Sequence, residues 1–69
     1  MMDATTLRRE VAAHVAECGA PATAQDRAAA TTAIAGRLAL RDPREWAAVR
    51  EAVGLAALDY ALQTTRRTP

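Results

Sequence analysis

The chain contains one cysteine, Cys18, which excludes an intrachain disulfide. Phenylalanine, serine, asparagine and lysine are absent, and the three glycines are isolated from one another. Isolated glycines cannot build the glycine-rich loop that cradles a phosphate group. No uninterrupted apolar run approaches the roughly 20 residues that a helix needs to span a bilayer. The chain therefore has no disulfide to stabilise it and few of the residue types that catalysis uses.

The formal charge of the chain is nearly balanced. Nine arginines against eight acidic residues leave a net charge of +1, so no chain-wide positive field favours nucleic acid or an anionic membrane. The first ten residues carry charges where a secretory signal needs an apolar stretch. We therefore expect a cytoplasmic protein with a reduced thiol. The arginine-only, alanine-rich composition is typical of a GC-rich bacterial genome.

Alanine makes up more than a quarter of the 69 residues. It favours helix more strongly than any other residue but fills little volume, so the few large apolar residues must form the core. A chain of this length forms at most one domain, whose own core supplies only marginal stability. Without a disulfide, further stability must come from a metal, a partner chain or close helix packing.

Helix start and stop signals divide the chain into three expected helices. The first ends at Gly19, a residue suited to a left-handed C-cap, and Pro21 prevents its continuation. Thr23 and Asp26 resemble a capping box at the start of the second helix, and the Asp-Pro pair at 42–43 begins the third. The expected helices therefore cover residues 5–18, 24–40 and 43–63, with a frayed polar tail at 64–69.

The connections between these helices are short, about four and about two residues, which favours antiparallel neighbours. We therefore predict an all-α fold: one domain, an antiparallel three-helix bundle whose third helix is the longest. Gly36 lies inside the second helix and is expected to allow close approach of a neighbouring helix. Residues at helical spacing form the expected core: Leu7, Val11, Val15, Ile34, Leu38, Trp46, Val49, Val53 and Tyr60.

The third helix carries apolar residues on two sides. Beside the stripe that belongs to the core, a second stripe consists of Leu55, Leu58 and Leu62, with Glu51 on the same side. A small monomer covers one such face, so we expect the second face to bind protein and the chain to self-associate. In the alternative, the other two helices flank the third from both sides and cover both stripes within one chain.

These features predict a non-catalytic protein-interaction module, acting as a homodimer, a small subunit, or a regulatory adaptor or inhibitor. Its expected partner-binding residues are Leu55, Leu58, Leu62 and Glu51. We expect neither enzymatic activity nor a cofactor. The residues offer no nucleophile with an oriented base, and a bundle of this size rarely holds a pocket of the usual volume.

A metal site is a weak candidate. Glu10, His14 and Cys18 follow one another at intervals of four residues, which places them in a row on the first helix. They supply two or three ligands, whereas a structural zinc site takes four. Cys18 also belongs to the apolar stripe of this helix, where a free cysteine acts as a small hydrophobic residue. We therefore predict no metal.

The alternative function is a small helical DNA-binding regulator that uses the second helix for recognition. The residues that would contact nucleic acid are Gln25, Arg27, Arg37, Arg41 and Arg44. Acidic residues at the starts of the second and third helices count against this alternative, because they would approach the phosphates.

Overall fold

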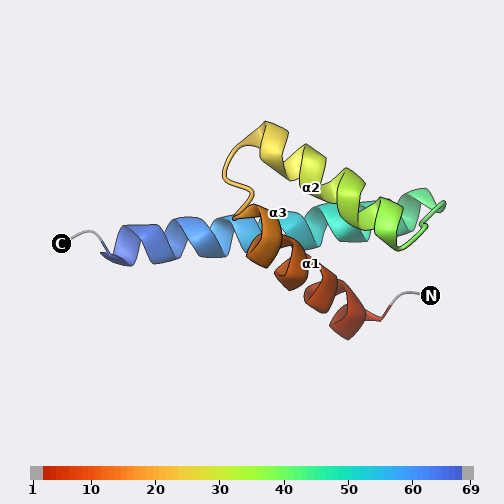
Figure 1. Ribbon diagram of the computed structural model, residues 1–69, viewed down its shortest axis with the longest axis horizontal. Coiled ribbons are helices and arrows are strands. Elements are labelled where there is room, and N and C mark those ends of the chain that lie inside the picture. Colours follow the sequence, from red (N-terminus) through yellow and green to blue (C-terminus); the bar gives the residue numbers. More distant parts are fainter. Residues whose placement is uncertain (1–2, 68–69) are drawn as a thin grey trace.

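The computed structural model describes residues 3–67 of the chain. These residues form three helices, α1 (Ala4–Cys18), α2 (Ala24–Arg37) and α3 (Pro43–Arg67), and no strand. Contact is most extensive between α2 and α3, and α1 packs against both (Figure 1). The all-helical class and the number of helices are confirmed, and the antiparallel order of the bundle stays a prediction.

The helix starts are determined by side chains that accept main-chain hydrogen bonds. Asp26 N donates to Thr23 Oγ1 at 3.0 Å and Thr23 N donates to Asp26 Oδ2 at 3.4 Å, which confirms the predicted capping box. Asp3 and Asp42 each accept from the main-chain N–H two residues on, at 3.3 and 2.9 Å. Because Asp3 supplies the cap, α1 begins at Ala4, one residue earlier than expected.

Helix α2 ends at Arg37, three residues before the predicted end. Leu40 N donates to Ala35 O at 3.0 Å and Ala39 N donates to Gly36 O at 3.1 Å, the two bonds of a Schellman motif. Ala39 has a φ of 54°, in the left-handed region that glycine usually occupies. The prediction of a helix through residue 40 is wrong because no glycine marks this turn in the sequence.

Helix α3 continues to Arg67, so the prediction of a frayed tail is wrong for residues 64–67. The hydroxyls of Thr64 and Thr65 donate to the carbonyl oxygens four residues earlier, at 3.0 and 2.9 Å. Threonines in this arrangement point along the helix and remain compatible with it. The last two residues of the expected tail, 68–69, lie outside the described residues.

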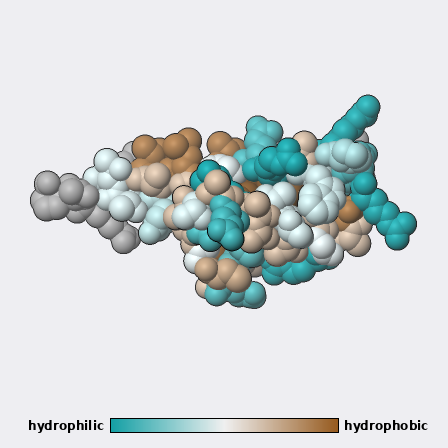
Figure 2. Space-filling model, turned by 90° about the horizontal axis from the view of Figure 1, so that it is seen from above, coloured by the Kyte–Doolittle hydropathy of each residue, from teal (hydrophilic) through white to brown (hydrophobic). Residues whose placement is uncertain are grey.

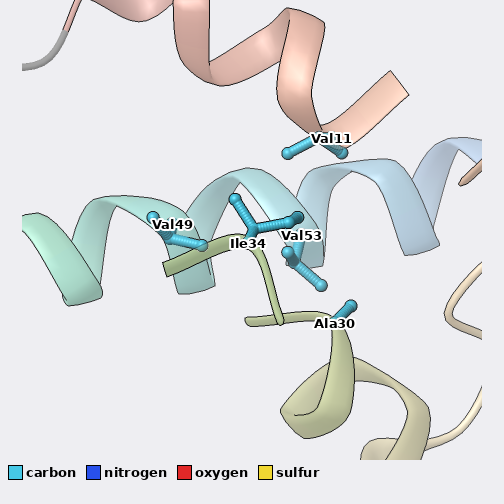
Figure 3. Packing of buried hydrophobic residues seen from close by; sticks show 5 residues of the cluster. All are labelled: Val11, Ala30, Ile34, Val49 and Val53. Carbon is cyan, nitrogen blue, oxygen red and sulfur yellow. The ribbon is translucent and has the colours of Figure 1, made fainter. Parts of the chain in front are cut away.

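The hydrophobic core draws on all three helices (Figure 3). Ile34 and Val49 have no exposed surface, and burying a side chain of this kind contributes about 1.5–3 kcal/mol. The central cluster consists of Val11, Ala30, Ile34, Val49 and Val53, with Leu7, Val15, Leu38 and Leu40 half-buried against it. The predicted core is therefore confirmed except at its two aromatic members, and Trp46 is half-buried outside this cluster. Ala30 is the member that the sequence pattern did not single out.

Tyr60 is not a core residue, and its prediction as one is wrong. It is 46% exposed, and Ala57 is the last buried residue of α3 among those up to residue 65. All residues from 58 to 65 are exposed. No residue from 58 to 65 is buried by α1 or α2, so the apolar stripe that predicted the core continues into solvent-exposed positions.

The second half of α3 extends past the other two helices (Figure 1). Helix α3 has 25 residues against 15 in α1 and 14 in α2, which accounts for a longest dimension of 44 Å. The close helix approach predicted at Gly36 is wrong: this glycine is exposed, and no atom of a neighbouring helix lies within 4 Å of the position its Cβ would take. Within residues 3–67, no helix combines the length and the hydropathy that crossing a membrane requires.

Candidate protein-binding surface

The large exposed hydrophobic side chains of the described residues gather on the second half of α3. Leu55, Leu58, Tyr60 and Leu62 are 62%, 56%, 46% and 50% exposed. Figure 2 shows a strongly hydrophobic surface over this part of the helix. A single exposed leucine is ordinary on a protein surface, whereas adjacent ones mark an interaction site. We call Leu55, Leu58 and Leu62 the leucine face.

The spacing of the leucine face places its members side by side. Intervals of three and four residues put side chains on one side of a helix, in the pattern of a coiled-coil seam. Glu51, which is exposed, precedes Leu55 by four residues and lies on the same side of the helix. The leucine face therefore carries an acidic side chain at the end nearer the start of α3.

The leucine face lies opposite the side of α3 that packs on α1 and α2. Val49, Val53 and Ala57 are buried on that packed side, and one helical turn of 3.6 residues places the leucines away from them. The alternative in which a single chain covers both stripes is therefore wrong. The other two helices cross only one side of α3 and leave the second side uncovered.

A groove of about 710 Å³ lies between α1 and α3, beside the leucine face. Its walls are mainly apolar and include Leu7, Val11, Val15, Ala52 and Ala56. Leu55 and Glu51 also line it, so the groove and the leucine face share an edge. Together they form one continuous surface with charged residues, Arg8 and Asp59 among them, at its margins.

A smaller hollow of about 330 Å³ lies between α2 and α3. Arg27, Arg50, Trp46 and two threonines contribute to its lining, and no acidic residue does. Its Thr31 hydroxyl is already occupied, because it donates to the carbonyl oxygen of Arg27 at 2.8 Å. This hollow is small and basic, in contrast to the larger apolar groove between α1 and α3.

The three residues considered for a metal do not form a site. Over residues 3–67, no group of three or more His, Cys, Asp and Glu side chains is placed to hold an ion. Glu10 instead pairs with Arg37, with 3.8 Å between Oε2 and Nε, and His14 is half-buried. Cys18 is exposed, so its prediction as a packed hydrophobic residue is wrong. It lies in the last turn of α1, past Val15, where that stripe ceases to be covered.

The residues proposed for nucleic-acid contact fall into two groups. Gln25 and Arg27 lie in the first turn of α2, whereas Arg37 is its last residue and Arg41 and Arg44 follow in the turn and in α3. Ten residues of helix separate Arg27 from Arg37, a distance of about 15 Å. The structure therefore does not gather these side chains into one patch, and DNA binding stays a prediction.

No protein-family model matches the chain, and neither a curated protein nor a solved structure matches it. The physical character of the surface therefore carries the functional inference.

Proposed function

We propose that this protein is a non-catalytic interaction module that binds a protein partner through the leucine face of α3. The observation that carries the proposal is the exposure of Leu55, Leu58 and Leu62, each of which keeps half or more of its surface in solvent. Full burial of a leucine is worth about 1.5–3 kcal/mol. Covering the remaining half of three leucines therefore offers a gain comparable to a good part of the stability of a small domain.

The surroundings of the leucine face match the anatomy of a protein interface. Interfaces have an apolar centre and a polar rim, and stable ones bury about 800 Å² on each partner. The groove between α1 and α3 enlarges the apolar area on the Leu55 side. Glu51, Asp59 and Arg8 stand at its margin, where charges determine orientation more than affinity.

Such a module acts by association, as a homodimer, as a small subunit of a larger assembly, or as a regulatory adaptor or inhibitor. It needs no cofactor for this role and performs no catalysis. We place it in the cytoplasm, because a reducing compartment keeps the exposed thiol of Cys18 free.

The proposal is tested with a double variant, Leu58→Glu with Leu62→Glu, and a matched control, Ala29→Glu with Ala33→Glu. The control adds the same charge at exposed positions of α2, away from the leucine face. Particle mass is measured by sedimentation for the purified protein, and by size-exclusion chromatography of a tagged chain in extract of its own host.

We expect the wild-type chain and the control to migrate above the 7.3 kDa of one chain in at least one setting, and the leucine variant to migrate as a monomer. Circular dichroism is expected to show the same helix content in all three, because the substituted residues lie outside the core. A wild-type chain that remains at 7.3 kDa in both settings, up to about 1 mM when purified, contradicts the proposal, because millimolar affinity is the weakest useful association.

A further inference from the structure

The basic hollow between α2 and α3 is separate from the proposed protein-binding surface. None of the residues that line it belongs to the leucine face or to the groove between α1 and α3. Its volume of about 330 Å³ lies at the small end of the range of small-molecule sites, which is about 300–1,000 Å³. A ligand bound in this hollow therefore leaves the leucine face free.

Two arginines from different helices meet in this hollow. Half-buried Arg27 of α2 and exposed Arg50 of α3 both line it. Neither forms an ion pair in the part of the chain whose side chains the structure describes. Arg27 Nη1 donates to the carbonyl oxygen of Ala22 at 3.4 Å, which uses one of the five N–H groups of its guanidinium. Two positive charges in one hollow favour an anionic ligand.

The acidic residues next to these arginines in the sequence do not line the hollow. The carboxylate of Asp26, which precedes Arg27, accepts from Thr23 N in the capping box of α2. Glu51, which follows Arg50, lines the groove between α1 and α3 instead. No described carboxylate of the lining therefore competes with an anion for the two guanidinium groups.

The donors of the hollow suit a phosphate group. A planar guanidinium donates two parallel N–H bonds to two oxygens of one phosphate. Thr32 is exposed and lines the hollow, so its hydroxyl is available as a further donor. A phosphomonoester carries a charge of about −1.5 to −2 at neutral pH. Two guanidinium groups match this charge better than they match the single charge of a carboxylate.

The rest of the lining is apolar and includes an aromatic ring. Ala24 and Ala28 contribute methyl groups from α2, and half-buried Trp46 lies one helical turn before Arg50 on α3. The indole Nε1 of Trp46 already donates to the carbonyl oxygen of Leu40 at 3.0 Å. The indole therefore offers the hollow its apolar ring, on which a flat aromatic group stacks favourably.

We propose that the hollow binds a small phosphomonoester that carries a flat aromatic group, the chemistry of a mononucleotide. The phosphate lies between Arg27 and Arg50, and the aromatic group packs on Trp46. This site goes beyond the proposed function and does not depend on it. Because the ligand contacts both α2 and α3, its binding is expected to raise the thermal unfolding midpoint of the chain.

Trp46 is the only tryptophan of the chain, so its fluorescence reports on the hollow directly. The purified full chain is titrated with adenosine monophosphate, adenosine and inorganic phosphate at constant ionic strength, which keeps charge screening equal. We expect a saturable change with adenosine monophosphate and a dissociation constant of about 1 mM or lower. Adenosine and inorganic phosphate each lack half of the contacts and are expected to bind at least about fivefold more weakly.

Arg27→Gln and Arg50→Gln each remove one guanidinium and keep a residue that favours helix. Each is expected to weaken the binding of adenosine monophosphate about fivefold or more. The matched control is Arg9→Gln, which removes the same charge from an exposed position of α1 that lines neither the hollow nor the groove. We expect it to leave the dissociation constant within about twofold of wild type. Circular dichroism verifies that every variant keeps its helices.

Three results would each overturn this site. The first is a fluorescence signal that does not saturate by about 10 mM adenosine monophosphate. The second is adenosine or inorganic phosphate binding as tightly as adenosine monophosphate. The third is an equal loss of binding in Arg9→Gln and in the two hollow variants, which would show attraction by net charge alone. None of these results bears on the proposed function, whose test is the particle mass of the leucine variant.

Discussion

The indole Nε1 of Trp46 donates a hydrogen bond to the main-chain carbonyl oxygen of Leu40 at 3.0 Å. The bond joins the first turn of α3 to the residue that closes the Schellman turn after α2. Leu40 also packs against the core, so both a hydrogen bond and a hydrophobic contact hold the junction between α2 and α3. The contact therefore ties the first turn of α3 to the turn that follows α2.

Replacing Trp46 with phenylalanine is expected to lower the free energy of unfolding by about 1–2 kcal/mol, because a hydrogen bond and part of the packed area are lost together. Urea denaturation followed by circular dichroism measures the change. Tyr60→Phe is the matched control: Tyr60 is exposed, and its replacement is expected to change stability by less than about 0.5 kcal/mol. Equal effects of the two substitutions would show that the bond to Leu40 contributes nothing.

Replacing Ala39 with glycine is expected to stabilise the protein by about 0.5–1 kcal/mol. Ala39 has a φ of 54°, where an alanine Cβ is strained and a glycine is not. Thermal unfolding at one fixed protein concentration measures the gain, since association makes the midpoint depend on concentration. The control is Ala33→Gly, at an exposed position inside α2, which is expected to destabilise by about 1 kcal/mol. A loss of stability at Ala39 would mean that this turn is not left-handed in solution.

Replacing Gly54 and replacing Gly19 with alanine are expected to change the stability of the protein in opposite directions. Gly54 lies inside α3 with no atom within 4 Å of its Cβ position, so Gly54→Ala is expected to stabilise the helix by about 0.5–1 kcal/mol. Gly19 has a φ of 87°, so Gly19→Ala is expected to destabilise by about 1–2 kcal/mol. Chemical denaturation of the two variants side by side tests this contrast, and a shared sign would contradict it.

The thiol of Cys18 is expected to react fully with a thiol reagent under native conditions, because the residue is exposed. Colorimetric titration with and without denaturant measures the accessible fraction. Replacing Cys18 with serine is expected to change the free energy of unfolding by less than about 0.5 kcal/mol. A thiol that reacts only after denaturation would restore the interpretation of Cys18 as a packed residue.

The local signals in the sequence predicted the helices well where a side chain marks the boundary. Thr23 with Asp26 and Asp42 with its following proline gave correct starts, because capping bonds join residues two or three positions apart. The predicted end of α2 was wrong because main-chain hydrogen bonds close the turn at Ala39, and no glycine in the sequence indicates this turn. The end of α3 was misplaced because threonines tolerate the helix as well as the tail.

The candidate site, too, could be predicted only in part. The sequence predicts which residues form the leucine face, because a period of 3.6 residues places Leu55, Leu58 and Leu62 together on any helix that forms there. Whether those leucines are covered does not follow from spacing. Tyr60 shares the spacing of the core residues and is nevertheless exposed.

The sequence by itself determined three helices, the starts of α2 and α3, and the gathering of the leucines on one side of α3, because each depends on contacts within one turn of helix. The tertiary structure alone decided which stripe is buried and how far. Burial depends on where α1 and α2 cross α3 and on how short they are beside it, and no residue from 58 to 65 is buried. The leucine face is exposed because α1 and α2 pack on the opposite side of α3, where Val49, Val53 and Ala57 are buried.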